Sequence, residues 1–195
     1  PGDLFDREWR DYNTGLYFHG RMVDLGRHGI RVFLVNGNHD AESEIGRSLR
    51  LPDNVHRFSV RHPETRRLDD LGVAVHGQGY ARAATAEDLS LGYPAPVPGF
   101  VNVGLLHTSA GGRAGHADYA PCSVEGLRAR GYDYWALGHV HRCEVLSRDP
   151  WVVWSGNTQG RHARETGEKG CMLVTVDGMR IESVRFEPLD VLRWA

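Results

Sequence analysis

Short apolar runs recur along the chain, and most of them end abruptly at a glycine or at polar residues. Their β-branched, aromatic and large aliphatic side chains are typical of buried strands. These runs predict strands at 30–35, 54–59, 73–76, 100–106 and 134–137. Two later pairs of runs predict hairpins, 143–146 with 151–154 and 170–176 with 179–186, the second around an Asp177-Gly178 turn.

Helical spacing replaces this pattern in several stretches between the predicted strands. In 11–28 the apolar residues recur at i, i+4 and i+7, and Gly29 follows as a stop signal. Shorter helices are predicted at 43–49, 83–91 and 123–130, the last with Ser123 as its N-cap. Strands alternate with helices early and follow one another later, which predicts a single α/β domain over 1–195 with mixed sheets.

Composition excludes several classes of protein but does not indicate an activity. The 195 residues are 41% hydrophobic and 25% charged, which is ordinary for a globular protein. The net charge of -2 predicts no broad basic surface, and no apolar run reaches the length of a membrane-spanning helix, so no membrane partner is expected. The three cysteines are far apart and form no C-x-x-C pair, which argues against a disulfide framework or a thiolate zinc site and favours the cytoplasm.

The strand predicted at 30–35 ends in the sequence Gly37-Asn38-His39-Asp40. In open α/β sheets, ligands bind at the carboxyl ends of strands. An amide oxygen and an imidazole at this place can bind a cation or a phosphate, while Asp40 can cap a following helix. The alternative is that these four residues form an ordinary turn and a helix cap.

Three further motifs carry similar side chains, and two of them directly follow predicted strands. They are Gly2-Asp3-x-x-Asp6, His107 after the run 100–106, and Gly138-His139-x-His141 after the run 134–137. If these strands are neighbours, their ends bring carboxylate, amide and imidazole groups together on one rim. Taken alone, His107 is more simply interpreted as a core histidine, whereas His139 and His141 alternate and can share a face.

Such a group of ligands suits metal-assisted hydrolysis of phosphoesters. Mixed oxygen and nitrogen ligands bind Mn, Fe or Zn, and two metals about 3.5–4 Å apart can activate water and clamp phosphate oxygens. We expect Asp3 to bridge the metals and Asn38 to bind a metal while its amide N–H faces substrate. We expect His39 to protonate the leaving oxygen. Arg161 and Arg164 can hold substrate phosphates, although an exposed, solvated face explains them about as well.

These motifs, in this order, resemble those of the calcineurin-like metallophosphoesterases. The similarity is greater to their SbcD/Mre11-like DNA repair exonuclease branch, in particular to the bacterial YhaO-type proteins. The residues that carry this closer resemblance are Gly2-Asp3-Leu4-Phe5-Asp6, the run 132–141, the segment 155–162 and Glu165-Thr166-Gly167.

The resemblance implies a four-layer α/β/β/α sandwich and a centre of two Mn²⁺ ions. Asp3 would bridge both metals; Asn38, His107 and His139 would complete one site, and His141 would belong to the other. His39 would be the catalytic histidine, with Asp6 near enough to orient it.

One departure from the family is important. The family opens with Asp-x-His on its first strand, and no such motif precedes Asp3 in this sequence. The site shared with His141 therefore keeps only Asp3 and His141, and we expect it to be weak or empty because ligand count sets affinity. We also expect that the first strand, a central one, and the C-terminal capping region are missing from this chain.

Three functions remain open. The first is a DNA repair exonuclease that works with an SbcC-type ATPase, which the Gln159-Gly160-Arg161-His162 segment favours; a homodimer is compatible with it. The second is a phosphoesterase on a small nucleotide or lipid phosphodiester, since one fold hosts many substrates. The third is a non-catalytic binding module with a defunct metal site, which the absent Asp-x-His motif favours.

Overall fold

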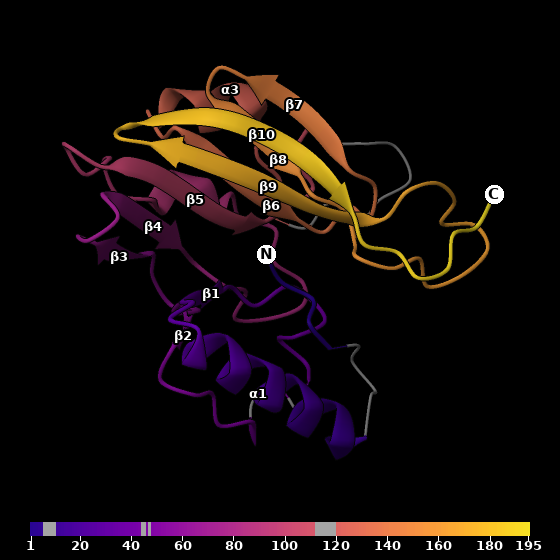
Figure 1. The fold of residues 1–195 in the computed structure, drawn as a ribbon. Helices are drawn as coiled ribbons and strands as arrows, with labels where there is room; N and C mark the ends of the chain where they lie inside the picture. Colours follow the sequence, from indigo (N-terminus) through magenta and orange to yellow (C-terminus); the bar gives the residue numbers. More distant parts are fainter. Residues whose placement is uncertain (6–10, 44–45, 47, 112–119) are drawn as a thin grey trace.

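The largest element of the protein is a six-stranded mixed sheet with the strand order β3-β4-β5-β6-β8-β7 (Figure 1). The computed structural model describes the chain apart from residues 6–10, 44–45, 47 and 112–119. Strands β4, β5, β6 and β8 are parallel, and β3 and β7 run antiparallel at the two edges. The strands are β3 Glu64–Leu68, β4 Val73–Gly77, β5 Val101–His107, β6 Tyr134–Gly138, β7 Glu144–Arg148 and β8 Trp151–Trp154.

Two smaller sheets accompany the large one. Strand β1 (Val32–Leu34) pairs in parallel with β2 (Val55–Arg57), and β9 (Gly170–Asp177) forms an antiparallel hairpin with β10 (Arg180–Pro188). In Figure 1 this hairpin crosses in front of β6 and β8. The predicted α/β class with mixed sheets is confirmed, and the six-stranded mixed sheet is consistent with the expected sandwich.

The hairpin turn lies one residue later than predicted. Asp177 pairs with Arg180, so Gly178 and Met179 form the two-residue loop. Gly178 has a φ of 55°, which a two-residue hairpin loop of the primed type requires and glycine adopts without strain.

Two α-helices follow the pattern that predicted them. Helix α1 (Tyr12–Arg27) starts after Asp11, whose side chain accepts the Asn13 N–H, and lies beside β1 and β2 (Figure 1). Helix α3 (Val124–Ala129) starts at the predicted N-cap, since the Ser123 hydroxyl accepts the Gly126 N–H at 2.9 Å.

The helix predicted at 83–91 is wrong. Only a 3₁₀ helix, η1 (Leu89–Gly92), forms at the end of that stretch. The Asp88 side chain accepts bonds from the Ser90 N–H and hydroxyl, which starts a short turn there, and Pro94 prevents its continuation. The helix predicted at 43–49 includes residues outside those described. Strand β3 was missed because its sequence, Glu-Thr-Arg-Arg-Leu, lacks apolar alternation.

The larger of two core clusters among the described residues lies between the large sheet and α3. Leu127 of α3 is fully buried and packs in one cluster with Trp135 and Leu137 of β6. The Trp135 indole N–H donates to the Leu127 carbonyl at 3.1 Å, so the ring is fixed by a hydrogen bond as well as by packing. Gly104 on β5 lies opposite Trp135 in the sheet register, and the indole occupies the space that a side chain there would need. This packing holds the ends of β5 and β6 side by side.

We predict that Gly104→Ala destabilises the protein by about 1–3 kcal/mol, because the added methyl overpacks this site. A Cβ at residue 104 would lie 2.8 Å from Cδ2 of Trp135 and nearer still to Cε3. The free energy of unfolding in urea measures the effect. The control is Gly20→Ala in α1, where a Cβ meets nothing within 4 Å and should be neutral or stabilising. Equal stability of Gly104→Ala and the wild type would contradict this packing.

Candidate metal centre

The ends of β5 and β6 bring two of the predicted histidines together. In the parallel register His107 pairs with Gly138, and the Thr108 N–H donates to the Gly138 carbonyl. His139 therefore follows directly beside His107, and the two rings meet edge to face with centroids 5.2 Å apart. This arrangement results from pairing two parallel strands that each end in a histidine motif.

The loop that carries Asp3 is attached to the 37–40 turn by one carboxylate. Asp40, only 5% exposed, accepts the backbone N–H groups of Asp3 (2.6 Å), Leu4 (2.9 Å), Phe5 (3.2 Å) and Gly37 (3.0 Å). Burial raises the pKa of Asp40 above its ordinary value, although these N–H groups oppose the shift. The structure corrects the predicted helix cap: Asp40 joins two segments that lie 37 residues apart.

Two glycines of the motifs allow the chain to close around the His107 ring. A Cβ at residue 37 would lie 2.7 Å from Cε1 of His107 and would overlap the Asp3 carboxylate. A Cβ at residue 138 would lie 2.8 Å from Nδ1 of His107 and would overlap the Pro1 carbonyl. Because real Cβ atoms do not approach so closely, the glycines are required for this packing.

The atoms that meet at this point are mostly hydrogen-bond acceptors. The Nδ1 of His107 lies 2.9 Å from the Pro1 carbonyl, which can only accept, so Nδ1 carries the proton. The Nε2 of the same ring then presents a lone pair to Asn38 Oδ1 at 3.0 Å and to Asp3 Oδ2 at 3.3 Å. Acceptor atoms this close repel one another unless a positive charge lies between them, and a bound cation would supply that charge.

A cation fits this donor set. Ligand atoms of Asp3, His107 and His139 lie within 4.8 Å of one another, and Asn38 adds an amide oxygen. The other carboxylate oxygen of Asp3 accepts the His39 N–H at 2.9 Å, which turns Oδ2 toward His107. Carboxylate, amide and imidazole together match the mixed oxygen and nitrogen coordination of Mn, Fe or Zn.

The charge on Asp3 is consistent with this role. Burial alone would raise the pKa of Asp3, but its contact with the His107 ring and the N–H of His39 lower it below its usual range. Asp3 is therefore an ionised carboxylate at neutral pH.

Backbone strain is concentrated at the same residues. Asp3 has a φ of 57° and His139 a φ of 93°, values that residues with a side chain adopt rarely. Among the described residues the only other such case is Ala120. Strained residues persist where the surrounding structure holds them and tend to occur at functional sites.

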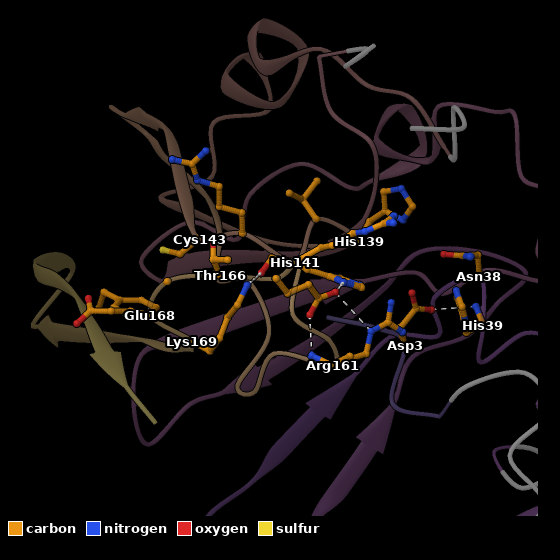
Figure 2. Close-up of a pocket in the computed structure, with 16 residues that line it drawn as sticks. Asp3, Asn38, His39, His139, His141, Cys143, Arg161, Thr166, Glu168 and Lys169 are labelled. Carbon is orange, nitrogen blue, oxygen red and sulfur yellow. Dashed lines mark hydrogen bonds and ion pairs between the residues drawn. The ribbon is translucent and has the colours of Figure 1, made fainter. Parts of the chain in front are cut away.

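An open cavity of about 1020 Å³ adjoins this cluster (Figure 2). Asp3, Asn38 and His39 lie at one end, and Glu168 and Lys169 lie at the other. Basic side chains of Arg142, Arg161, Arg164 and Lys169 line it together with the acidic Asp3, Glu165 and Glu168.

The predicted histidine His141 lines the cavity but is not part of the Asp3, His107 and His139 cluster among the described residues. Its Nδ1 lies 2.7 Å from the Glu165 carboxylate. Burial would raise the pKa of Glu165, but bonds from the Arg161 N–H, from His141 and from Asn157 lower it to about 2. The membership of His141 in a second metal site stays a prediction.

The remaining predicted residues have mixed outcomes. Asp6 lies outside the described residues, so its position relative to His39 stays untested. Arg161 lines the cavity, where its Nε lies 3.5 Å from a carboxylate oxygen of Glu165. His76, which matches no motif, is fully buried between Thr65 and Asn102 and stacks on Tyr132.

Sequence reasoning gave no role to Tyr80, Glu165 or Lys169. Tyr80 is buried and packs edge to face on His107, with ring centroids 5.3 Å apart. Lys169 is only 6% exposed, and its ammonium donates to the His141 carbonyl at 3.2 Å. Glu165 and Lys169 carried signals in the sequence: Glu165 is in a segment with family resemblance, and Lys169 is the only lysine in the chain.

Comparison with known proteins finds a relative that aligns with nearly the whole chain. The chain is 37% identical over 197 aligned residues to a protein of Bacillus subtilis (strain 168) named "Uncharacterized metallophosphoesterase YhaO". The alignment covers 99% of this chain and 48% of that protein, so the chain spans about half the length of its relative. No family model matches the chain. Within the described part of the chain, no helix has the length and apolar character needed to cross a membrane.

We predict that Asp40→Asn destabilises the protein by about 2–3 kcal/mol. The amide oxygen can replace only one carboxylate oxygen, and the NH₂ group would face the N–H groups that the other oxygen served. Urea unfolding measures the loss. The matched control is Asp69→Asn, an exposed carboxylate paired with Arg67, which should change stability by less than about 0.5 kcal/mol. If the free energy of unfolding of Asp40→Asn equals that of the Asp69→Asn control, Asp40 does not hold the Asp3 loop.

Proposed function

We propose that this chain carries the catalytic centre of a metal-dependent phosphoester hydrolase, since its similarity to a metallophosphoesterase over 99% of its length supports that family. The observation that carries the proposal is the group of acceptor atoms from Asp3, Asn38 and His107, with His139 beside them. This group opens on a cavity whose lining includes Arg142, Arg161 and Arg164 beside its acidic residues, and these guanidinium groups suit an anionic substrate.

Each residue of the centre has a distinct task in this proposal. Asp3, Asn38, His107 and His139 would hold a divalent cation, which supplies Lewis acidity toward a phosphoryl oxygen when bound. His39 faces the cavity beside Asn38 and would donate a proton to the leaving oxygen. Its backbone N–H also fixes the orientation of the Asp3 carboxylate.

The finer points of the centre are proposals that rest on the family resemblance. A second cation would share Asp3 and take His141 as a ligand, and Mn²⁺ is the expected metal at both positions, with Fe or Zn as alternatives.

DNA is the substrate that we favour. Arg142, Arg161 and Arg164 line the cavity and can contact successive phosphates of a nucleic-acid backbone. Because the chain spans about half of its relative, the activity, substrates and partners of a whole protein are proposals too. They comprise exonuclease action in DNA repair, an SbcC-type ATPase partner, a homodimer and a cytoplasmic location. A small nucleotide or lipid phosphodiester is the alternative substrate.

We predict that the chain hydrolyses bis(p-nitrophenyl) phosphate with Mn²⁺, that EDTA abolishes the activity and that added Mn²⁺ restores it. His39→Ala should keep the bound metal and lose about 10²–10⁴-fold in kcat, the usual contribution of a general acid. His107→Ala should lose the metal as well, because it removes a ligand. Elemental analysis of the purified variants and steady-state kinetics measure the two effects separately.

The control is His62→Ala, since His62 is exposed and its ring lies 3.3 Å from the carbonyl of the neighbouring Pro63, away from the centre. It should match the wild type in metal content and rate. A wild-type protein that binds no divalent metal would end the hydrolase proposal. A His39→Ala variant with full activity would remove His39 from the mechanism.

The substrate is tested with linear duplex DNA labelled at one end, with closed circular DNA as the control. An exonuclease should release nucleotides from the linear DNA in Mn²⁺ and leave the circle intact. Turnover of the chromogenic diester without any release of nucleotides would favour the small-substrate alternative.

A further inference from the structure

His141, one of the predicted metal ligands, lies in the cavity wall, where hydrogen bonds fix its backbone. The His141 carbonyl accepts the Asn157 N–H at 3.3 Å and the Lys169 ammonium at 3.2 Å. Lys169 is 6% exposed and is the only lysine in the sequence. A compact ammonium on a flexible stem fits this single carbonyl, whereas a guanidinium has a wider, planar fork.

The chain also comes unusually close to His141 at Gly156. This glycine has a φ of 74°, and a Cβ there would lie 3.0 Å from the His141 carbonyl oxygen and 2.8 Å from the Cys143 nitrogen. Only glycine allows both the backbone conformation and this approach. The backbone of His141 is therefore held in place by the segment 156–169.

The imidazole of His141 is held as well. Its Nδ1 lies 2.7 Å from Oε1 of Glu165, and an ionised carboxylate can only accept. Nδ1 therefore carries a proton, and a neutral ring has its lone pair on Nε2. Which ring nitrogen can bind a metal is set by the hydrogen bond that the other one makes.

Glu165 is fixed in turn by bonds to its other oxygen. Oε2 accepts the side-chain N–H of Asn157 at 2.8 Å and the backbone N–H of Arg161 at 2.9 Å. The Glu165 side chain is 11% exposed. The carboxylate therefore cannot turn away from His141 without breaking two bonds, and the His141 ring at 2.7 Å is closer to Oε1 than the Arg161 Nε at 3.5 Å.

We propose that Glu165 is a positioning residue of the centre, which holds His141 in the tautomer with a free Nε2 and so makes Nε2 the atom offered to a divalent cation. Lys169 supports it by fixing the His141 backbone. This inference rests on the proposed function only in assuming that His141 binds a metal. Carboxylates that orient a metal-binding histidine typically change metal affinity or activity by about 10–100-fold when they are replaced.

The test variant is Glu165→Gln in the full chain. The amide oxygen of glutamine should stay with the two donors from Asn157 and Arg161, which leaves its NH₂ group facing Nδ1 of His141. The ring should then change to the tautomer with the proton on Nε2. The matched control is Glu64→Gln, since Glu64 also accepts a backbone N–H, from Ser59, and contacts the ring of His56.

The first measurement is the ¹⁵N NMR spectrum of the histidine rings in the metal-free protein, with His141 assigned by its substitution. We expect the Nδ1–H tautomer at His141 in the wild type and in Glu64→Gln, and the Nε2–H tautomer in Glu165→Gln. An Nε2–H tautomer in the wild type would overturn the proposal without any variant. The proposal therefore stays testable even if Glu165→Gln fails to fold.

The second measurement is Mn²⁺ binding by isothermal titration calorimetry. Glu165→Gln should weaken the position that includes His141 by about 10–100-fold and leave the position held by Asn38, His107 and His139 unchanged. Glu165→Asp should recover part of the loss. Equal Mn²⁺ affinity in Glu165→Gln and the wild type would refute the role of Glu165. A wild type that shows the expected tautomer but binds no Mn²⁺ would refute the proposed function instead, so the two failures are distinct.

Discussion

The parallel register of β5 and β6 is the constraint on which the candidate centre depends. It sets His107 against Gly138 and makes His139 the next residue along the rim. A shift of β6 by one residue would turn its side chains to the other face of the sheet and would move His139 away from His107. The register is secured behind the site by Trp135, which packs over Gly104 and bonds to α3 through the Leu127 carbonyl. The position of the two histidines therefore depends on the packing of the core behind them.

Around this pair, the chain uses carboxylates for two different purposes. Asp40 and Glu165 accept hydrogen bonds from N–H groups. Asp40 connects the Asp3 loop to the 37–40 turn, and Glu165 orients the His141 ring in the cavity wall. Asp3 alone turns an oxygen toward the imidazole of His107. The acceptor atoms of the centre are therefore held in place by neighbours that do not themselves need to bind a ligand, which is how a site can be rigid before its ligand arrives.

Much of the fold, and the convergence of the candidate residues at one end of the sheet, could be predicted because both follow from local patterns. Apolar runs that end in Gly-Asn-His-Asp, in His107 and in Gly-His-x-His place polar side chains at strand ends, and parallel strands collect their ends at one edge. What the sequence could not show were contacts between distant residues. The bonds from Asp40 to Asp3 and from Glu165 to His141 span 37 and 24 residues, and no periodic pattern encodes them. The helix predicted at 83–91 failed for a local reason, since Asp88 bonds to Ser90 and Pro94 follows.

The central claim is that Asp3, Asn38, His107 and His139 together bind a divalent cation at the end of the sheet. The most direct test is a crystal of the protein grown with MnCl₂, with anomalous diffraction collected on both sides of the manganese edge. The account predicts an anomalous peak in contact with Asp3 Oδ2 and His107 Nε2. Manganese bound elsewhere, or no anomalous peak between Asp3 and His107, would contradict it.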